Sequence, residues 1–269
     1  MHLFLTVVWG AAMVSSVAAQ SLLFPPQYTA DSIVNAASQT VQRASPNTIL
    51  TIYGQDLAFT PWAISPRELL NPSLPTATPL EDVAVSIDNV RMPLFFVSPT
   101  QINVLVHPSR APGLRTLVVS RGLVRGPAIR IQLTAETPEL FRMPAGHAAA
   151  THADGAILDE ARPAEPGEVI VLYGTGFGPL RQQDLSVIVP VRPIEVSRAA
   201  AFRVRLNGEE LPRENILYVG VTPGFAGLYQ LNLRLPAELP ANPNIQVGLD
   251  GNWSVENLPL PTISATPAP

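Results

Sequence analysis

The stretch TILTIYG at residues 48–54 returns later in the chain as EVIVLYG at residues 168–174. The two tyrosines, Tyr53 and Tyr173, lie 120 positions apart. Both stretches are apolar at consecutive positions, which is typical of a central β-strand covered on both faces. The same strand therefore occurs twice.

Two further pairs of similar segments occur in the same order in both copies and at nearly the same separation. The turn IDN at residues 87–89 returns as LNG at residues 206–208, and QIN at residues 101–103 returns as QLN at residues 230–232. Solenoid repeats are about 20 to 50 residues long, so a repeat of this length is a whole duplicated domain.

Strand periodicity dominates both copies. Apolar and polar residues alternate with period two, which predicts strands with one buried face and one wet face. Short turns such as Asp88-Asn89 and Asn207-Gly208 separate them, as in antiparallel sheets. The sequence therefore predicts an all-β fold of two tandem antiparallel sandwiches. The alternating buried positions are Val83, Val85 and Ile87; Ile129, Ile131 and Leu133; Phe202, Val204 and Leu206; Leu231, Leu233 and Leu235; and Ile245, Val247 and Leu249.

One short segment, SPRELL at residues 65–70, looks helical. Ser65 is a capping residue, Pro66 suits the first helical position, and Glu68 lies three residues after the cap. We expect a turn or two of helix within a loop.

The duplication sets the predicted boundaries. Residues 138–165, at the start of the second copy, have no counterpart at matching distance in the first. The predicted parts are a signal peptide (1–19), an N-terminal extension (20–27), sandwich 1 (28–137), sandwich 2 (138–260) and a Pro-rich tail (261–269).

The first 19 residues have the pattern of an export signal. An uncharged apolar run at residues 3–14 precedes small side chains up to Ala19, which predicts cleavage after Ala19 and a secreted, periplasmic or cell-surface location. The alternative is an uncleaved anchor, although the run is shorter than the ~20 apolar residues of a span. We expect no membrane span in the mature chain.

Composition excludes several functions. The chain has no cysteine, which rules out disulfides, thiol catalysis and cysteine-ligated metals. The net charge is −4, and neither half has the basic excess of a nucleic-acid binder. One acid-free run precedes Glu136, and it is either a solvated face or a contact for an acidic glycan or the acidic second half. Its arginines are Arg110, Arg115, Arg121, Arg125 and Arg130, the last expected to point outward.

Four runs together resemble the Solibacter-type uncharacterised C-terminal domain family. They are IVNAAS at residues 33–38, PLFFVSPTQIN at 93–103, PGEVIVLYGTGFGP at 166–179 and PGFAGLYQLN at 223–232. The resemblance covers nearly all of the expected mature chain. It implies immunoglobulin-like (IPT/TIG-like) β-sandwiches of exported bacterial proteins, and it implies no catalytic residues.

A metal site would need His147, His152 and Asp154 to converge. If this stretch is a strand, His147 and His152 point to opposite faces, and the two remaining side chains are too few for a tight site. We therefore expect a strand running into a turn, with no metal and no other cofactor.

The sequence matches neither a phosphate-binding glycine loop nor the nucleophile elbow of a serine hydrolase. The glycine-rich run at residues 174–178 follows a strand, but Pro179 comes next and no lysine follows, so a sharp turn or bulge is the better interpretation. A nucleophile elbow is absent, and a hydrolase would have to gather His107 or His147 with a serine and a carboxylate from separate places. We expect that the protein is not an enzyme.

The function expected instead is non-catalytic binding, adhesion or a structural role outside the cytoplasm, with an extracellular protein or polysaccharide as partner. The contacts are expected from loops 60–78 and 174–184, because sandwiches usually present function on loops. Trp62 and Trp253 could stack on a sugar, which makes a carbohydrate-binding module the alternative, or pack on the sandwich edge. The candidate contact residues are Trp62, Trp253, Arg121 and Arg125.

Overall fold

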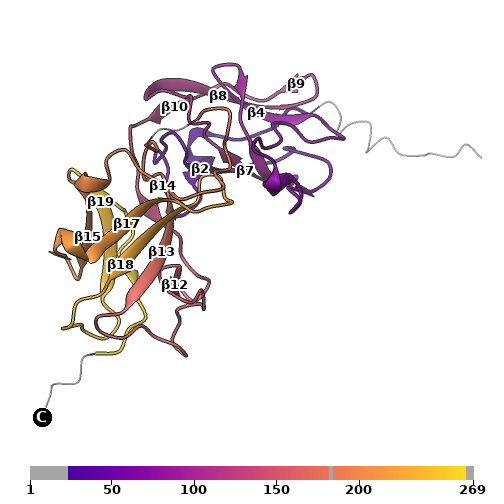
Figure 1. Ribbon diagram of the computed structural model, residues 1–269. Coiled ribbons are helices and arrows are strands. Elements are labelled where there is room, and N and C mark those ends of the chain that lie inside the picture. Colours follow the sequence, from indigo (N-terminus) through magenta and orange to yellow (C-terminus); the bar gives the residue numbers. More distant parts are fainter. Residues whose placement is uncertain (1–23, 182–183, 265–269) are drawn as a thin grey trace, which may run out of the picture.

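The computed structural model describes residues 24–181 and 184–264. The predicted signal peptide, residues 20–23 of the predicted N-terminal extension and residues 265–269 of the predicted tail lie outside the described residues. In the described part, the strands form four antiparallel sheets, stacked two by two (Figure 1). No helix in this part is both long and apolar enough to cross a membrane.

The first sandwich has the strand order of an immunoglobulin domain. One sheet runs β1-β2-β7-β6-β3 and the other β10-β8-β4-β5, with β9 beside β8. With β1 as strand A, the order β1-β2-β7-β6 is A-B-E-D and the order β10-β8-β4-β5 is G-F-C-C′. Strand β3 is an additional strand beside β6. The bounds are β1 (Ile33–Asn35), β2 (Ile49–Tyr53), β3 (Trp62–Ala63), β4 (Val83–Ile87), β5 (Val90–Arg91), β6 (Leu94–Val97), β7 (Gln101–Leu105), β8 (Gly113–Arg121), β9 (Val124–Arg125) and β10 (Ile129–Leu133).

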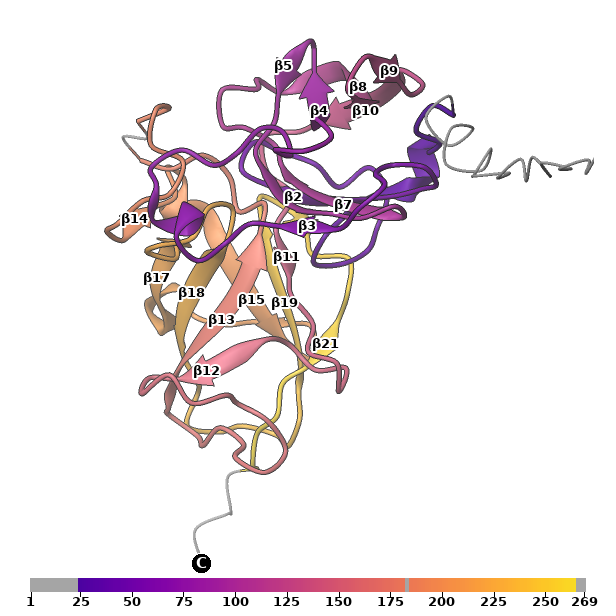
Figure 2. The same cartoon turned by 90° about the vertical axis from the view of Figure 1, so that its right-hand side faces the viewer.

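The second sandwich repeats this order. One sheet runs β11-β13-β18-β17-β14 with β12 beside β13, and the other runs β16-β15-β19-β20 with β21 beside β19 (Figure 2). The prediction of two tandem immunoglobulin-like sandwiches is confirmed. The bounds are β11 (Glu139–Leu140), β12 (Ala150–His152), β13 (Val169–Thr175), β14 (Ile194–Glu195), β15 (Phe202–Leu206), β16 (Glu209–Glu210), β17 (Ile216–Val221), β18 (Tyr229–Arg234), β19 (Asn244–Leu249), β20 (Asn252–Trp253) and β21 (Leu258–Pro259).

The repeated motifs pair with each other at the same register in both copies. Tyr53 lies opposite Gln101 in the β2–β7 pair, and Tyr173 lies opposite Gln230 in the β13–β18 pair. The side-chain amide of Gln101 donates to Asn103 at 2.9 Å, and that of Gln230 donates to Asn232 at 3.1 Å. The duplicated sequence is therefore a duplicated strand pair with the same polar outer face.

The prediction that the repeated strands are covered on both faces holds in the middle of β2, where Leu50, Thr51 and Ile52 are all buried, and is wrong for β13. Along β13, buried positions alternate with partly exposed ones, and Tyr53 at the end of β2 is 41% exposed. In a two-layer sandwich the strand face away from the core is open to solvent where no other segment covers it, as along β13.

Each sandwich has its own apolar core, and a third cluster lies between them. The first core contains buried residues from Tyr28 to Leu133, and the second contains residues from Leu140 to Leu260. The third consists of Leu74 and Leu105 from the first sandwich with Ile188, Val189 and Ala226 from the second.

The helical segments are single 3₁₀ turns. They are η1 (Ala30–Ser32), η2 (Glu68–Leu70), η3 (Ala199–Ala201) and η4 (Arg213–Asn215). At η2 the predicted capping pattern is present, because Ser65 N donates to Glu68 Oε2 at 2.8 Å while Glu68 N donates to Ser65 Oγ at 3.3 Å.

Candidate functional site

The two loops expected to reach an outside partner are partly used between the sandwiches. Ile188 N and Val189 N donate to Pro72 O at 2.8 and 3.3 Å, and Leu74 is buried beside them. Residues 174–178 are buried as well. The prediction that this second loop faces outward is therefore wrong for its first five residues, because Thr175 and Gly176 lie against the first sandwich and Phe177 lies in the core of the second.

The glycine-rich loop is shaped by close approach of backbone. Gly176 has a φ of 74°, and a Cβ there would lie 2.3 Å from Thr137 O. The neighbouring Thr175 hydroxyl donates to Gly227 O at 2.8 Å and accepts from Ile49 N at 3.0 Å. The loop thus bonds one sandwich to the other, which favours the structural interpretation over phosphate binding.

A charged pair links the sandwiches beside this loop. Arg43 Nε donates to Glu139 Oε1 at 2.7 Å, and the same guanidinium donates to Asn252 Oδ1 at 2.7 Å and to Trp253 O at 3.0 Å. Burial raises the pKa of the Glu139 carboxyl, while Arg43 acts in the opposite direction. Sequence reasoning missed both residues, since neither lies in a motif.

An apolar shelf lies at the β3 edge of the first sandwich. Trp62 is half-buried against the first core, and Leu80, across a hollow of about 300 Å³, is 89% exposed. The hollow is lined by Pro61, Trp62, Pro79 and Leu80, and we call these residues, together with the exposed Phe59 that precedes them in the chain, the Trp62 platform.

Hydrogen bonds and a cation–π contact fix the position of the segment at Phe59 and Thr60. The Glu81 carboxylate accepts from Phe59 N at 2.7 Å and from Thr60 N at 2.8 Å. The Arg121 guanidinium lies over the Phe59 ring, 3.9 Å from its centroid. The platform is thus a fixed apolar surface.

Arg121 is not the surface ligand contact that its sequence position suggested. It is 5% exposed, and its guanidinium donates to the carbonyls of Asp56 at 2.5 Å and Phe24 at 2.8 Å. These bonds tie the loop before the platform to the first described residues of the chain. Arg121 therefore supports the platform from inside.

Arg125 lies on the other sheet of the same sandwich. It is exposed on β9, at a shallow hollow of about 330 Å³ that also involves Arg91 and Ser120. Arg91 is engaged by Asp82 through two bonds of 2.8 and 2.9 Å. The structure does not bring Arg125 to Trp62.

Trp253 lies in the second sandwich with one ring face already occupied. The Arg205 guanidinium carbon is 3.6 Å from the ring centroid, and Arg205 is paired with Glu210 at 3.0 Å. A Cβ at Gly248 would lie 2.7 Å from the ring, so the indole also lies against the backbone. A sugar could stack on the Arg205 side only by displacing that side chain.

The histidines are engaged separately. His152 has Glu168 Oε1 at 2.5 Å from Nδ1 and Arg162 O at 3.1 Å from Nε2, whereas His147 Nδ1 lies 3.0 Å from Ala148 O. Asp154 forms an ion pair with Arg162 at 2.8 Å. Among residues 24–181 and 184–264, no three His, Asp or Glu side chains are grouped as metal ligands would be.

His107 lies in the first sandwich, next to a serine. Its Nδ1 accepts from Ser109 N at 3.1 Å and lies 2.7 Å from Ser109 Oγ. Burial and the nearby Arg110 lower the pKa of His107. Two residues of one turn make this contact, and the Ser109 hydroxyl also accepts from Arg110 at 3.1 Å. The arrangement is that of a hydrogen-bonded turn.

Comparison with known proteins gives fold likeness only. No family model matches the chain and no curated protein matches it, so the resemblance to the Solibacter-type family stays a prediction. A surface glycan-binding protein from Prevotella bryantii aligns with 86% of this chain at 13% identity and a TM-score of 0.26. A second surface glycan-binding protein, from the mixed-linkage glucan utilization locus of Bacteroides ovatus, aligns with 82% at 9% identity and 0.31.

The extracellular region of plexin A4 aligns with 83% of this chain at 11% identity and a TM-score of 0.26. The chain spans 41% of each glycan-binding protein and 15% of the plexin. At these scores the likeness carries no argument about what this chain binds.

Proposed function

We propose that this chain is an exported, non-catalytic binding protein whose contact surface is the Trp62 platform. The observation that carries the proposal is an exposed aromatic and aliphatic shelf fixed in place by Glu81 and Arg121. Contiguous exposed apolar groups with a polar support are typical of a recognition site. The partner is an extracellular protein or polysaccharide.

Non-catalytic action is supported by the placement of the histidines. His107 and His147 belong to different sandwiches, and their nearest polar groups are a serine and a backbone carbonyl. A hydrolase of the serine–histidine–carboxylate type would need one of them beside both a nucleophile and a carboxylate.

Among ligand classes, a polysaccharide is favoured by Trp62. An indole flanked by Pro61 and Leu80 offers a flat apolar face to a pyranose ring, and the exposed Thr60 backbone and side chain lie beside it. Trp253 does not offer this, because Arg205 already lies over its ring.

The two tryptophans supply a matched test. Wild-type protein, Trp62→Ala and Trp253→Ala are incubated with a panel of insoluble polysaccharides, and the bound fraction is measured. We expect retention of wild type and Trp253→Ala, and binding by Trp62→Ala that is weaker by up to about tenfold, since a stacking contact contributes up to about 1.5 kcal/mol. No retention of wild type on any polysaccharide removes the carbohydrate class.

Export and cleavage of the signal peptide are tested in a separate experiment. The protein is expressed with residues 1–19 in a bacterial host, and the amino terminus of the exported product is sequenced. We expect it to begin at Gln20, and a product that keeps Met1 and stays in the membrane contradicts the proposal.

A further inference from the structure

The outer faces of the two duplicated sheets carry the same three side chains at the same register. Residues beside them have diverged, since Thr51 lies opposite the asparagine in the first copy and Val171 in the second. Outward-facing groups that both copies keep while their neighbours change favour a role in recognition over a role in packing. We call each set a Tyr–Gln–Asn face. The sets are Tyr53, Gln101 and Asn103 in the first copy and Tyr173, Gln230 and Asn232 in the second.

The amides of both faces have hydrogen-bonding groups left over. Asn103 Oδ1 accepts from Gln101 at 2.9 Å and from Thr51 at 3.1 Å. In the part of the chain that the structure describes, Nδ2 of Asn103 and Nδ2 of Asn232 donate to no protein atom, and Oε1 of Gln101 and Oε1 of Gln230 accept from none. These four side chains are half-buried, so each face offers a fixed donor and a fixed acceptor to a ligand.

The tyrosine rings of the two faces are held by their hydroxyls. Tyr53 is 41% exposed, and its hydroxyl donates to Gln39 Oε1 at 2.8 Å. The Tyr173 hydroxyl lies 3.3 Å from Thr151 Oγ1. A ring that is already held in place loses little conformational freedom when a ligand stacks on it.

A second aromatic ring lies beside the asparagine in each copy. Phe96 is paired with Asn103 and Tyr218 with Asn232, in both cases next to a β-bulge. The Tyr218 ring lies against the backbone, because Gly220 has no side chain and a Cβ there would come within 2.6 Å of Tyr218 Cζ. Its hydroxyl donates to a backbone carbonyl of the same strand at 3.1 Å. A fixed ring beside an amide suits a sugar, since the ring contacts the apolar face of a pyranose while the amide bonds its hydroxyls.

The two faces border the same angle between the sandwiches. Ile49 N donates to Thr175 Oγ1 at 3.0 Å, and a Cβ at Gly227 would lie 2.5 Å from Leu105 Cδ1. The second sandwich therefore contacts the first sheet where β2 begins and β7 ends. Figure 1 shows β12 and β13 on the side of the second sandwich over which the first one extends, and Figure 2 shows β2 and β7 in the layer of the first sandwich nearer to them.

The spacing of the faces fits an extended ligand. Tyr53 lies four residues after Ile49 on β2, and Tyr173 lies two residues before Thr175 on β13. At about 3.3 Å per residue, the two tyrosines are about 13 Å and about 7 Å from the contact between the sandwiches. A chain of several sugar units therefore reaches both faces, whereas a single sugar reaches one.

The residues that flank the Gln–Asn pairs are all uncharged, which favours a neutral ligand. Glu195 approaches the Tyr218 phenol, but its carboxylate forms an ion pair with Arg181 at 3.5 Å. Hydroxyl groups of a neutral sugar match amide donors and acceptors without the desolvation of an ion. The flanking residues are Thr51, Tyr53 and Phe96 in the first copy and Val171, Tyr173 and Tyr218 in the second.

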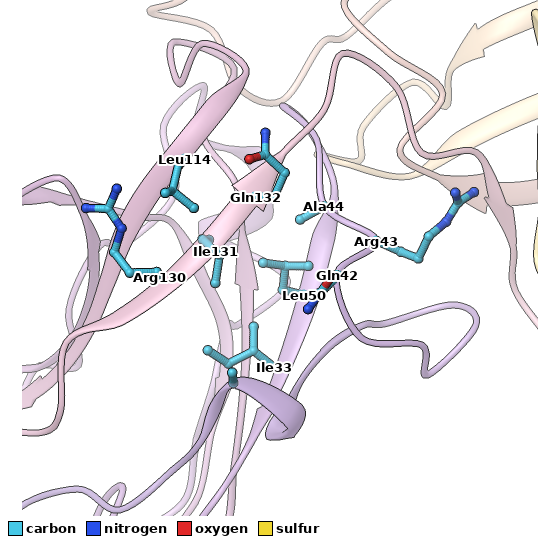
Figure 3. Close-up of a pocket in the computed structure, with 10 residues that line it drawn as sticks. Ile33, Gln42, Arg43, Ala44, Leu50, Leu114, Arg130, Ile131 and Gln132 are labelled. Atoms are coloured by element: carbon cyan, nitrogen blue, oxygen red, sulfur yellow. The ribbon is translucent and has the colours of Figure 1, made fainter.

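The hollow at the β1 and β10 edge of the first sandwich is a poorer candidate. Its volume is about 250 Å³, and apolar side chains of Ile33, Leu50 and Ile131 lie around it (Figure 3). Residues 41–44 of the same chain bridge β1 and β10 there, so the hollow belongs to the closure of the sandwich. Among the described residues, its lining contains no aromatic ring.

We propose that one chain of a neutral polysaccharide binds across both Tyr–Gln–Asn faces. Its sugar rings stack on Tyr53 and Tyr173, and the amides of the two faces bond its hydroxyl groups. Duplication of the sandwich thereby supplies two half-sites for one ligand, and linking them raises the affinity above that of either face. The proposal does not depend on the Trp62 platform, and different variants test the two surfaces.

Isothermal titration calorimetry of the mature protein tests the ligand class. The probes are four neutral soluble polymers, namely hydroxyethyl cellulose, arabinoxylan, galactomannan and dextran, with polygalacturonate as the acidic control. We expect at least one neutral polymer to bind more tightly than polygalacturonate, and to bind equally at low and high salt because no charge takes part. A disaccharide cut from that polymer should bind much more weakly, because it cannot reach both faces.

Variants of the two tyrosines test the site. Tyr53→Ala and Tyr173→Ala should each weaken binding by up to about tenfold, since each removes one stacking contact. Tyr53→Phe and Tyr173→Phe keep the ring and should bind nearly as wild type does. Trp253→Ala removes an aromatic ring from the other sheet of the second sandwich and should leave binding unchanged.

Nitration of tyrosine, measured by mass spectrometry, locates the ligand without a variant. The bound polymer should slow nitration of both Tyr53 and Tyr173 in wild type. Circular dichroism checks the folding of each variant, and if Tyr173→Ala is unfolded, the nitration of wild type decides.

Three results overturn the proposal. They are wild type that binds none of the neutral polymers, a loss of binding in only one of the two alanine variants, and bound polymer that leaves nitration of both tyrosines unchanged. Trp62→Ala separates the two surfaces. Weaker binding by Trp62→Ala with unchanged binding by Tyr53→Ala and Tyr173→Ala assigns the glycan to the platform and not to the two faces, whereas the reverse pattern assigns it to the faces.

Discussion

Arg43 and Glu139 form an ion pair of 2.7 Å across the boundary between the sandwiches, and the Glu139 side chain is only 1% exposed. Val255 N also donates to this carboxylate at 3.1 Å. A buried carboxylate is tolerated only with such partners. The pair therefore couples the connection between the domains to the stability of the whole chain.

Removing the arginine alone should be costly. We expect Arg43→Met to lower the free energy of unfolding by about 3 kcal/mol, because it leaves a buried carboxylate unpaired. Glu139→Gln should cost less, since an amide oxygen can still accept from Val255. Urea unfolding measures both, with the exposed Arg67→Met as control. A loss at Arg43 no larger than at Arg67 contradicts the assignment.

The glycine loop gives a prediction with an internal control. Gly176 and Gly224 have similar positive φ values, 74° and 80°, but a Cβ at Gly224 meets no atom within 4 Å. Both changes to alanine should cost about 1 kcal/mol for the backbone conformation. Gly176→Ala should cost more because of the contact with Thr137 O. Equal losses in thermal unfolding would show that the loop can move aside.

Alkaline pH should weaken the protein through its buried phenols. Burial, followed by the Glu195 carboxylate, raises the pKa of Tyr218 to about 12, and full burial raises the pKa of Tyr229. An unfolded tyrosine titrates near ~10. Their contribution is therefore complete below about pH 10 and is lost as pH rises towards about 12.

Denaturant unfolding at a series of pH values checks this sign. Wild type should lose stability between about pH 10 and 12, and Tyr218→Phe should lose less over the same window. Absorbance at 295 nm should show a late phenol ionisation that Tyr218→Phe removes. Parallel pH profiles for wild type and variant contradict the prediction.

The fold could be predicted because its signals are local and occur twice. Alternating residues such as Phe202, Val204 and Leu206 face the core as expected. Glutamine and asparagine on the outer face of β7 and β18 mark the same register in both copies. These patterns need no knowledge of distant contacts.

The connection between the domains could not be predicted in this way. Arg43 and Glu139 are 96 positions apart, and each looks like an ordinary surface charge in the sequence. The buried loop at residues 174–178 has the composition of an exposed turn. Only the spatial arrangement shows that these groups meet, because their partners come from the other copy.

The same limit applies to Arg121 and Arg125, which the sequence places together as candidate contacts and the structure separates. Arg121 donates to two backbone carbonyls and holds the Phe59 ring, whereas Arg125 is exposed. Hydrogen bonds from a charged donor contribute about 1.5 to 3 kcal/mol each, so Arg121→Met should cost at least about 2 kcal/mol. Arg125→Met should stay within about 0.5 kcal/mol of wild type.

Comparing Arg121→Met with Arg125→Met also distinguishes a residue that supports the Trp62 platform from a residue that contacts the ligand directly. Arg121→Met frees Phe59 and the segment at Phe24, so it should speed proteolysis before residue 60 and weaken any ligand retention that depends on Trp62. Arg125→Met should change neither, because the Arg125 side chain is exposed at the hollow beside Arg91 and Ser120 and not at the platform. Limited proteolysis with mass spectrometry, run beside the retention assay at a temperature where both variants are folded, gives the two readouts. If Arg125→Met loses ligand while Arg121→Met keeps it, the contact surface lies on the sheet containing β8 and β9, and the platform is not the binding site.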